Sequence, residues 1–138
     1  MTRGVPQGTV LGPLLFSLFI NDLPLSISNP LVSCDLFADD TSIQSSDEKM
    51  SHVQSSLQQG LNDSANWCYL NQIVIYPGKT KCITLASRQK HQTEPLTLNL
   101  VFDNPIEQVH SHKVLGVLID DKLRWETHFI ISTQTFKA

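Results

Sequence analysis

The chain has 138 residues, of which 41% are hydrophobic and 17% are charged. These values indicate a globular domain with a core of its own and exclude a disordered chain. The net charge of −3 means that any nucleic-acid surface is local or lies mostly outside this chain, because phosphate contacts normally draw on a surplus of lysine and arginine.

The first segment, Met1 to Pro13, is rich in glycine and proline, with a glycine at every fourth position from Gly4 to Gly12. Such a stretch is either a flexible surface loop or a backbone that comes close to a ligand or to another chain. A well-buried helix is predicted next, since Pro13 suits a first turn and apolar residues follow at helical spacing. Those residues are Leu11, Leu14, Leu15, Leu18 and Phe19. Pro24 predicts that the helix ends near Asn21.

A strand over Leu31 to Ala38 runs into two adjacent carboxylates, Asp39 and Asp40, and β-forming residues follow them. The pattern predicts a β-hairpin with acids at its tip, which suits a hard cation such as Mg²⁺. The alternative is a polar turn without a ligand. Asp35 shares a strand face with Asp39 if pairing is regular, and it is either a third ligand or a solvated edge residue.

Beyond the hairpin, Ser46-Asp47 resembles a helix cap, and apolar residues at Val53, Leu57, Leu61 and Ala65 predict a long helix with a narrow buried face. Short strands are predicted next, separated by turns at Pro77-Gly78 and at residues 103–105. Their ranges are 72–76, 79–85 and 96–102, with a partner strand from Ile106.

Three further features lie near the C-terminal end. His110 and His112 could bind a metal, but without acids or cysteines at ligand spacing a plain polar strand is favoured. Residues 113–119 read as a strand in which Gly116 marks a close backbone approach. Asp120-Asp121 reads as a turn and helix cap rather than a metal site.

The cysteines, Cys34, Cys68 and Cys82, have no Cys-x-x-Cys spacing, which indicates free thiols in a reducing compartment. The N-terminus has no signal-peptide pattern, and the most apolar run, Leu14 to Ile20, is too short to span a bilayer. We therefore expect an intracellular protein, in the nucleus or the cytoplasm, that is not secreted and has no membrane partner.

Four short motifs follow one another along the chain: Gly4-Val-Pro-Gln-Gly8, Phe37-Ala-Asp-Asp40, Lys79-Thr-Lys81 and Leu115-Gly-Val117. In this order they resemble the reverse transcriptase domain of LINE-type (non-LTR) retrotransposons of the jockey or CR1 kind, from Gly4 to about Trp125. The resemblance implies an α+β fold: part of a polymerase palm, in which an antiparallel sheet with helices on one face carries the Asp-Asp hairpin. The palm would cover residues 1–125, and residues 126–138 would begin the thumb or form a frayed tail.

The resemblance also assigns roles to residues. Asp39 and Asp40 would hold Mg²⁺, with Mn²⁺ as a substitute, and Lys79 would lie near the nucleotide phosphates. Template and nucleotide contacts would come from Pro6, Gln7 and Gly8, and the primer grip from Leu115 and Gly116. The implied partners are an RNA template, a DNA primer and a deoxynucleoside triphosphate. Tyr76 departs from the family pattern, which has asparagine there, and Gly78 replaces a commoner Ser or Glu.

In the family, the first metal-binding aspartate precedes the Gly-Val-Pro-Gln-Gly loop, and the chain has no acid between Met1 and Val10. The resemblance therefore implies a palm fragment without the fingers, the first catalytic-aspartate motif or the N-terminal half of the polymerase domain. We expect such a chain by itself to bind Mg²⁺ weakly and to extend no primer, because a two-metal site needs an acid from a second strand. The alternatives are a non-catalytic retrotransposon remnant and a small α/β interaction module.

Overall fold

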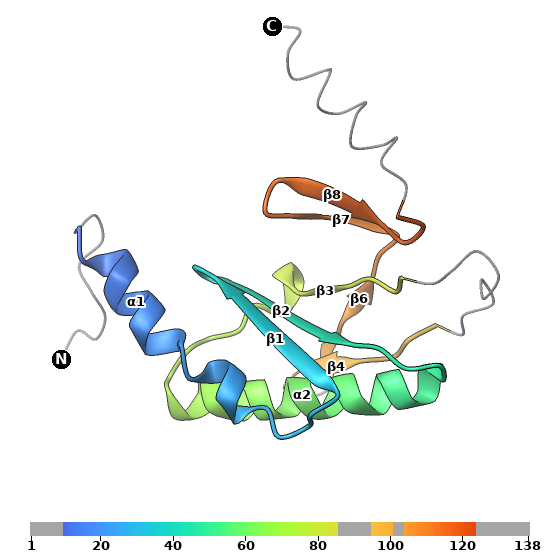
Figure 1. Cartoon of the computed structure of the whole chain (residues 1–138), viewed down its shortest axis with the longest axis horizontal. Coiled ribbons are helices and arrows are strands. Elements are labelled where there is room, and N and C mark those ends of the chain that lie inside the picture. Colours follow the sequence, from blue (N-terminus) through green and yellow to red (C-terminus); the bar gives the residue numbers. More distant parts are fainter. Residues whose placement is uncertain (1–9, 86–94, 101–103, 124–138) are drawn as a thin grey trace, which may run out of the picture. The chain divides into compact units, whose positions relative to one another are not determined.

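The computed structural model describes residues 10–85, 95–100 and 104–123. The chain divides into two units, Met1–Ile75 and Tyr76–Ala138. Helices and short strands are mixed in it, so the α+β class is confirmed (Figure 1).

The first unit begins with helix α1, Gly12–Ile20, which has Pro13 in its first turn as predicted. A 3₁₀ turn, η1 (Leu23–Ser26), follows. Pro24 lies in its first turn, where the backbone N–H that proline lacks would have no partner within the helix. Ile20 and Leu23 pack with Trp67 and Cys68 of the long helix α2, Met50–Leu70, to form the buried core of this unit. The rings of Phe19 and Trp67 also meet, with their centroids 5.8 Å apart.

Helix α1 differs from its prediction in one respect. Most of its apolar side chains are exposed, and Leu18 keeps 67% of its surface accessible, whereas a well-buried helix was expected. The periodicity located the helix correctly, but within the described residues α1 meets the core through Phe16, Phe19 and Ile20, in its C-terminal half.

Strands β1 (Val32–Phe37) and β2 (Asp40–Ser45) pair as an antiparallel hairpin. Figure 1 shows this hairpin lying across α2. The two elements approach closely at Gly60, where an added Cβ would lie 2.8 Å from a methyl group of Val32. The most buried helix positions under the hairpin are therefore small: Ser56, Gly60 and Ser64. The apolar positions predicted to face inward, such as Leu57 and Leu61, are only half-buried beside them.

Helix α2 also begins later than the sequence suggested. Its N-cap is Lys49, which provides no side-chain cap, and the carboxylate of Asp47 instead accepts a hydrogen bond of 2.9 Å from the Lys49 backbone N–H. Asp47 therefore caps the turn that precedes the helix. This hydrogen bond, with a further contribution from His52, holds the pKa of the Asp47 carboxyl below its ordinary value.

The second unit is built from short elements. A 3₁₀ turn, η2 (Pro77–Lys79), precedes β3 (Lys81–Cys82), which pairs in parallel with β6 (Glu107–Gln108). Strand β4 (Asn99–Leu100) pairs antiparallel with β5 (Asn104–Pro105), and β7 (Ser111–Val114) pairs antiparallel with β8 (Val117–Asp120).

Several strand predictions are corrected by this pairing. The described strands form four two-stranded sheets, one of them parallel, rather than one antiparallel sheet. Residues 73–76 are not a strand in the described structure, although Ile73 and Ile75 pack against the core of the first unit. The alternation predicted for residues 96–102 is confirmed from Leu96 to Leu100, since Leu96, Leu98 and Leu100 are all buried. Only Asn99–Leu100 form a strand there, and residues 101–102 lie outside the described residues. Among the described helices, none combines the length and the apolar character that a membrane span requires.

Candidate functional site

The tip of the β1–β2 hairpin holds the two adjacent carboxylates. Phe37 pairs with Asp40, so Ala38 and Asp39 form a two-residue turn and Asp40 opens β2. Ala38 has a φ of 52°, in the left-handed region that alanine seldom adopts, while Asp39 has no positive φ. A positive φ at the first central residue only is the sign pattern of a type II′ turn, whose twist matches that of a hairpin.

The register decides which face carries the acids. Val32, Cys34 and Leu36 are half-buried on the side of β1 that faces α2, and the residues between them are exposed. Asp40 stands opposite Phe37, on the exposed side. The Asp40 carboxylate therefore lies on the hairpin face that α2 leaves uncovered, and Asp39 is exposed in the turn beside it.

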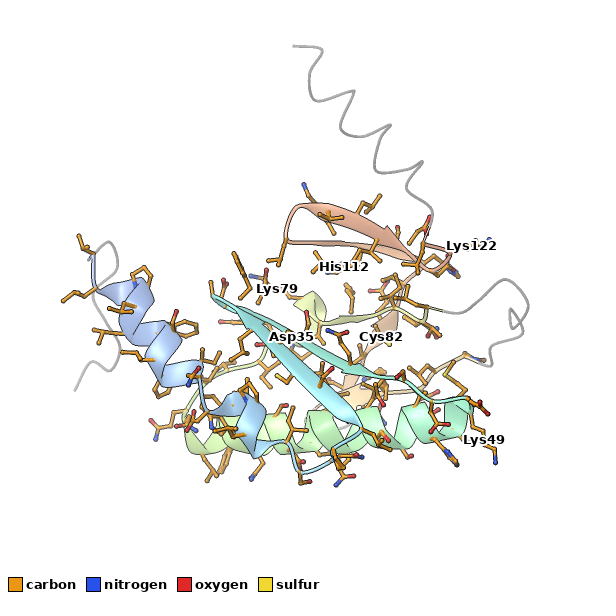
Figure 2. All side chains as sticks on the ribbon, viewed as in Figure 1. Asp35, Lys49, Lys79, Cys82, His112 and Lys122 are labelled. Carbon is orange, nitrogen blue, oxygen red and sulfur yellow. The ribbon has the colours of Figure 1, made fainter. Side chains whose placement is uncertain are left out.

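Asp35 lies further along the same open face and is labelled in Figure 2. Its carboxylate accepts a hydrogen bond of 2.6 Å from the side-chain amide of Gln44 on β2. Asp35 is exposed, and one of its carboxylate oxygens accepts this hydrogen bond. These observations favour a solvated edge residue over a third metal ligand. The Gln44 contact had no signal in the sequence.

The donor chemistry at the hairpin tip fits a hard divalent cation. Carboxylate oxygens are the ligands that Mg²⁺ prefers, and Mg²⁺ commonly takes only one or two of them and completes its shell with water and phosphate. Within the described ranges, no group of three or more His, Cys, Asp or Glu side chains could hold a metal ion. The described structure therefore assembles no metal site of three such side chains around Asp39 and Asp40.

Lys79 ends the 3₁₀ turn of the second unit and is exposed. Its backbone N–H donates to the Tyr76 carbonyl at 3.1 Å, and its ammonium lies 5.8 Å from the centre of the Tyr76 ring. Lys81, two residues on, instead forms an ion pair with Glu107 across the β3–β6 pair. This contact lowers the pKa of the Glu107 carboxyl, first through the hydrogen bond and then through the charge of Lys81. No ion pair with an acidic side chain occupies Lys79 in the described structure.

The β7–β8 hairpin turns at Leu115 and Gly116, where a single strand over residues 113–119 was predicted. Both residues have positive φ, 48° and 85°, which is the pattern of a type I′ turn. Among the described residues, a Cβ on Gly116 would meet nothing within 4 Å, so the role that the structure shows for this glycine is the positive φ of the turn. Leu115 is 54% exposed at the tip.

The remaining candidates near the C-terminal end are structural. The His110 ring nitrogen Nδ1 lies 2.8 Å from a carboxylate oxygen of Asp121. The carboxylate of Asp120 accepts a hydrogen bond from the Lys122 backbone N–H, which confirms the turn predicted for the second acid pair. The helix that the pair was predicted to cap lies outside the described residues. The cysteines are free thiols, and burial raises the pKa of each one.

The predicted site residues are divided between the two units of the chain. Asp39 and Asp40 belong to the first unit, and Lys79, Leu115 and Gly116 to the second. Pro6, Gln7 and Gly8 lie outside the described residues. The contact of Lys79 with Tyr76 was not predicted, although an aromatic residue three positions before a lysine in a turn-forming segment could have suggested it.

Comparison with known proteins supplies the context for these motifs. A family model described as "Reverse transcriptase (RNA-dependent DNA polymerase)" matches residues 1–119. Among curated proteins, the chain is 33% identical over 97% of its length to the probable RNA-directed DNA polymerase from transposon BS of Drosophila melanogaster. It is 30% identical, over its whole length, to the RNA-directed DNA polymerase from mobile element jockey of the same species. It is 32% identical over 93% of its length to the probable polymerase from transposon X-element.

The chain spans about 15% of the length of each of the first two of these relatives. No solved structure matches it significantly.

Proposed function

Because the chain belongs to the reverse transcriptase (RNA-dependent DNA polymerase) family, we propose that it is the segment of such a polymerase that carries the Asp39-Asp40 pair of the active site. The observation behind this proposal is the β1–β2 hairpin, in which Asp39 lies in the turn and Asp40 lies on the face that α2 leaves open. A primer terminus and a nucleotide need such an uncovered, acidic and rigid edge.

Asp39 and Asp40 would hold a divalent cation, Mg²⁺ or Mn²⁺, which when bound lowers the cost of negative charge on the reacting phosphate. The backbone next to both carboxylates is supported, because the strands are paired up to Phe37 and Asp40 and α2 packs against the other face of the hairpin. The Lys79 ammonium would shield the triphosphate or give a proton to the leaving pyrophosphate. Its exposure and the absence of an acidic partner in the described structure support this role.

The other roles are proposed from the motifs. Leu115 and Gly116, at the exposed tip of the β7–β8 hairpin, would contact the primer end. Pro6, Gln7 and Gly8 would position the template and the nucleotide. In this proposal residues 1–125 are part of the palm and residues 126–138 begin the thumb.

The substrates of the whole polymerase follow from the same proposal. The relatives are named as RNA-directed DNA polymerases, so the substrates would be an RNA template, a DNA primer and deoxynucleoside triphosphates. A location in the nucleus or the cytoplasm belongs to this proposal, since those substrates are found there. The chain would act as part of a longer polypeptide, like the relatives that exceed its length.

Metal binding tests the proposal on the chain itself. Mn²⁺ added in small amounts to isotope-labelled protein should broaden the NMR amide signals of residues 38–41 first, since paramagnetic relaxation falls off steeply with distance from the ion. Asp39→Asn and Asp40→Asn keep the shape of the side chain but remove its charge, and each should reduce this broadening. The chain offers a matched control in its second acid pair: Asp120→Asn with Asp121→Asn should leave the broadening at the hairpin unchanged. Equal broadening in the Asp40→Asn protein would contradict the proposal.

Polymerase activity is best tested in a chimera. The matching segment of the jockey polymerase, which this chain resembles over its whole length, would be replaced by residues 1–138. We expect the chimera to extend a DNA primer on an RNA template, and Asp40→Asn to lower the rate about a hundredfold or more. Glu48→Gln, at an exposed position before α2, is the control and should leave the rate unchanged. A chimera that is equally active with Asp40→Asn would refute the assignment.

A further inference from the structure

One aromatic residue is placed against a proposed functional side chain. Tyr76 is 66% exposed as a residue and lies directly before the 3₁₀ turn that ends in Lys79. The Lys79 ammonium lies over this ring, 5.8 Å from its centre, within the range of a cation–π contact. No other cation–aromatic pair is found among the described residues.

The backbone between the two residues favours this contact. The Tyr76 carbonyl accepts the Lys79 backbone N–H at 3.1 Å and the Thr80 hydroxyl at 3.4 Å. The Thr80 N–H donates to the Pro77 carbonyl, also at 3.1 Å, and Pro77 fixes its own φ. These hydrogen bonds hold the turn from Tyr76 to Thr80 in one conformation. The turn brings the side chain of Lys79, three residues after Tyr76, back over the Tyr76 ring.

A cation–π contact leaves the ammonium able to bind an anion. The ring attracts the charge without accepting a proton or using the ammonium as a hydrogen-bond donor in the way that a carboxylate does. Lys81 shows the contrast, because its ammonium is committed to Glu107. Holding a long side chain in place also removes part of the entropy that it would lose on binding phosphate.

We propose that Tyr76 is a positioning residue that holds the Lys79 ammonium ready for the phosphates of an incoming nucleotide. This inference rests on the proposed function of Lys79 and adds a residue that departs from the asparagine of the family pattern. The chemical class of ligand is a polyphosphate anion. The contact with Tyr76 orients the positive charge of Lys79, and it makes no hydrogen bond that would distinguish one nucleotide base from another.

The test uses the whole chain, with inorganic tripolyphosphate as the probe at low ionic strength. Two quantities are measured by NMR: the chemical shift of the Lys79 ε-protons, and the tripolyphosphate affinity from a titration. In the unaltered chain the aromatic ring current should move the ε-protons upfield. Tyr76→Leu should abolish this shift and weaken tripolyphosphate binding by about two- to fivefold. Tyr76→Phe keeps the ring face and should preserve both.

Two controls separate the possible failures. Tyr69→Leu removes another exposed tyrosine, on α2, and should change neither quantity. Lys79→Gln should weaken tripolyphosphate binding more than Tyr76→Leu does. If Lys79→Gln has no effect, the proposed role of Lys79 fails and the role of Tyr76 fails with it. If Lys79→Gln weakens binding but Tyr76→Leu does not, or if the upfield shift persists in Tyr76→Leu, only the role of Tyr76 is overturned.

Discussion

Ala38 carries the conformational strain of the Asp-Asp hairpin. Its φ of 52° brings the Cβ too close to the following carbonyl oxygen of the backbone. This steric strain costs about 1–2 kcal/mol of conformational free energy. The neighbouring strands hold it there, since β1 and β2 are paired up to Phe37 and Asp40 on either side. A small side chain keeps that cost low, and this explains why alanine is acceptable between the phenylalanine and the acids.

A bulkier residue at this position should therefore destabilise the fold. We expect Ala38→Val to lower the free energy of unfolding by about 1–2 kcal/mol, because a β-branched side chain fits the left-handed region worst. Ala38→Gly should be close to neutral, since the relief of strain offsets the entropy gained by the unfolded chain. Urea unfolding measures both. Ser33→Val, at an exposed strand position with an ordinary φ, is the control and should not destabilise. An Ala38→Val protein as stable as the parent would show that the turn is not strained.

Local signals were sufficient for some residues and not for others. The acid pair between two apolar runs predicted a turn, because alternation and turn chemistry act within a few residues. The same reasoning failed at Leu115-Gly116, where β-forming neighbours suggested one continuous strand and the chain instead reverses at two positive-φ residues. The Gln44–Asp35 and Lys79–Tyr76 contacts depend on register and side-chain direction, which periodicity does not report.

At the scale of elements, the contact between α2 and the hairpin depends on small residues. Ser56, Gly60 and Ser64 follow one another at intervals of four and are all buried. The Ser64 hydroxyl donates to the Gly60 carbonyl at 2.8 Å, so the helix satisfies its own buried polar group. The apolar pattern of the sequence predicted that the neighbouring positions, such as Leu57 and Leu61, face inward, and these are only half-buried. The buried row of Ser56, Gly60 and Ser64 was missed because small residues give no hydrophobic signal.

Gly60 should resist substitution for this reason. Alanine is the better helix former by about 1 kcal/mol, yet its Cβ would lie 2.8 Å from Val32 and 3.5 Å from Ile43. Overpacking of this kind costs about 1–3 kcal/mol, so we expect Gly60→Ala to destabilise the chain in urea unfolding. Val32→Ala removes the methyl group concerned, and the Gly60→Ala substitution should then cost less in the Val32→Ala background than alone. Additive effects of the two substitutions would contradict this account of the contact.

The parallel β3–β6 pair carries an ion pair that should respond to acid. The Lys81 ammonium donates a hydrogen bond to Glu107 and lowers the pKa of that carboxyl from its ordinary value of 4.5. A pKa that is lower in the folded state means that the contact favours folding above pH 4.5 and that this contribution is lost as the pH falls through the folded-state pKa.

We therefore expect Glu107→Gln to be less stable than the parent chain near neutral pH and equally stable at a pH well below the folded-state pKa. Urea midpoints at the two pH values measure this. Glu48→Gln, at an exposed position without an ion pair in the described structure, should show no such convergence. A Glu107→Gln deficit that persists at low pH would mean that the substitution acts through packing rather than charge.

At the scale of the whole molecule, α1 shows how much apolar surface the described structure leaves uncovered. The sequence from Val10 to Asn21 contains no charged residue, and the side chains of Leu11, Leu14, Leu15, Leu18 and Phe19 are exposed. Patches of this kind normally mark an interface. The relatives are several times longer than this chain, so apolar surface that a longer polymerase could cover is exposed to water here.

Self-association of the isolated chain should follow from this surface. Two α1 helices can meet without opposing charges, and burying their leucines removes apolar area from water. We expect the weight-average sedimentation coefficient to rise with protein concentration. Leu14→Gln with Leu18→Gln should reduce this rise, because the pair places amides at the centre of the face. Leu70→Gln changes an equally exposed leucine at the end of α2 and should leave the association unchanged. A sedimentation coefficient that is independent of concentration in the parent chain would show that α1 tolerates its exposure without a partner.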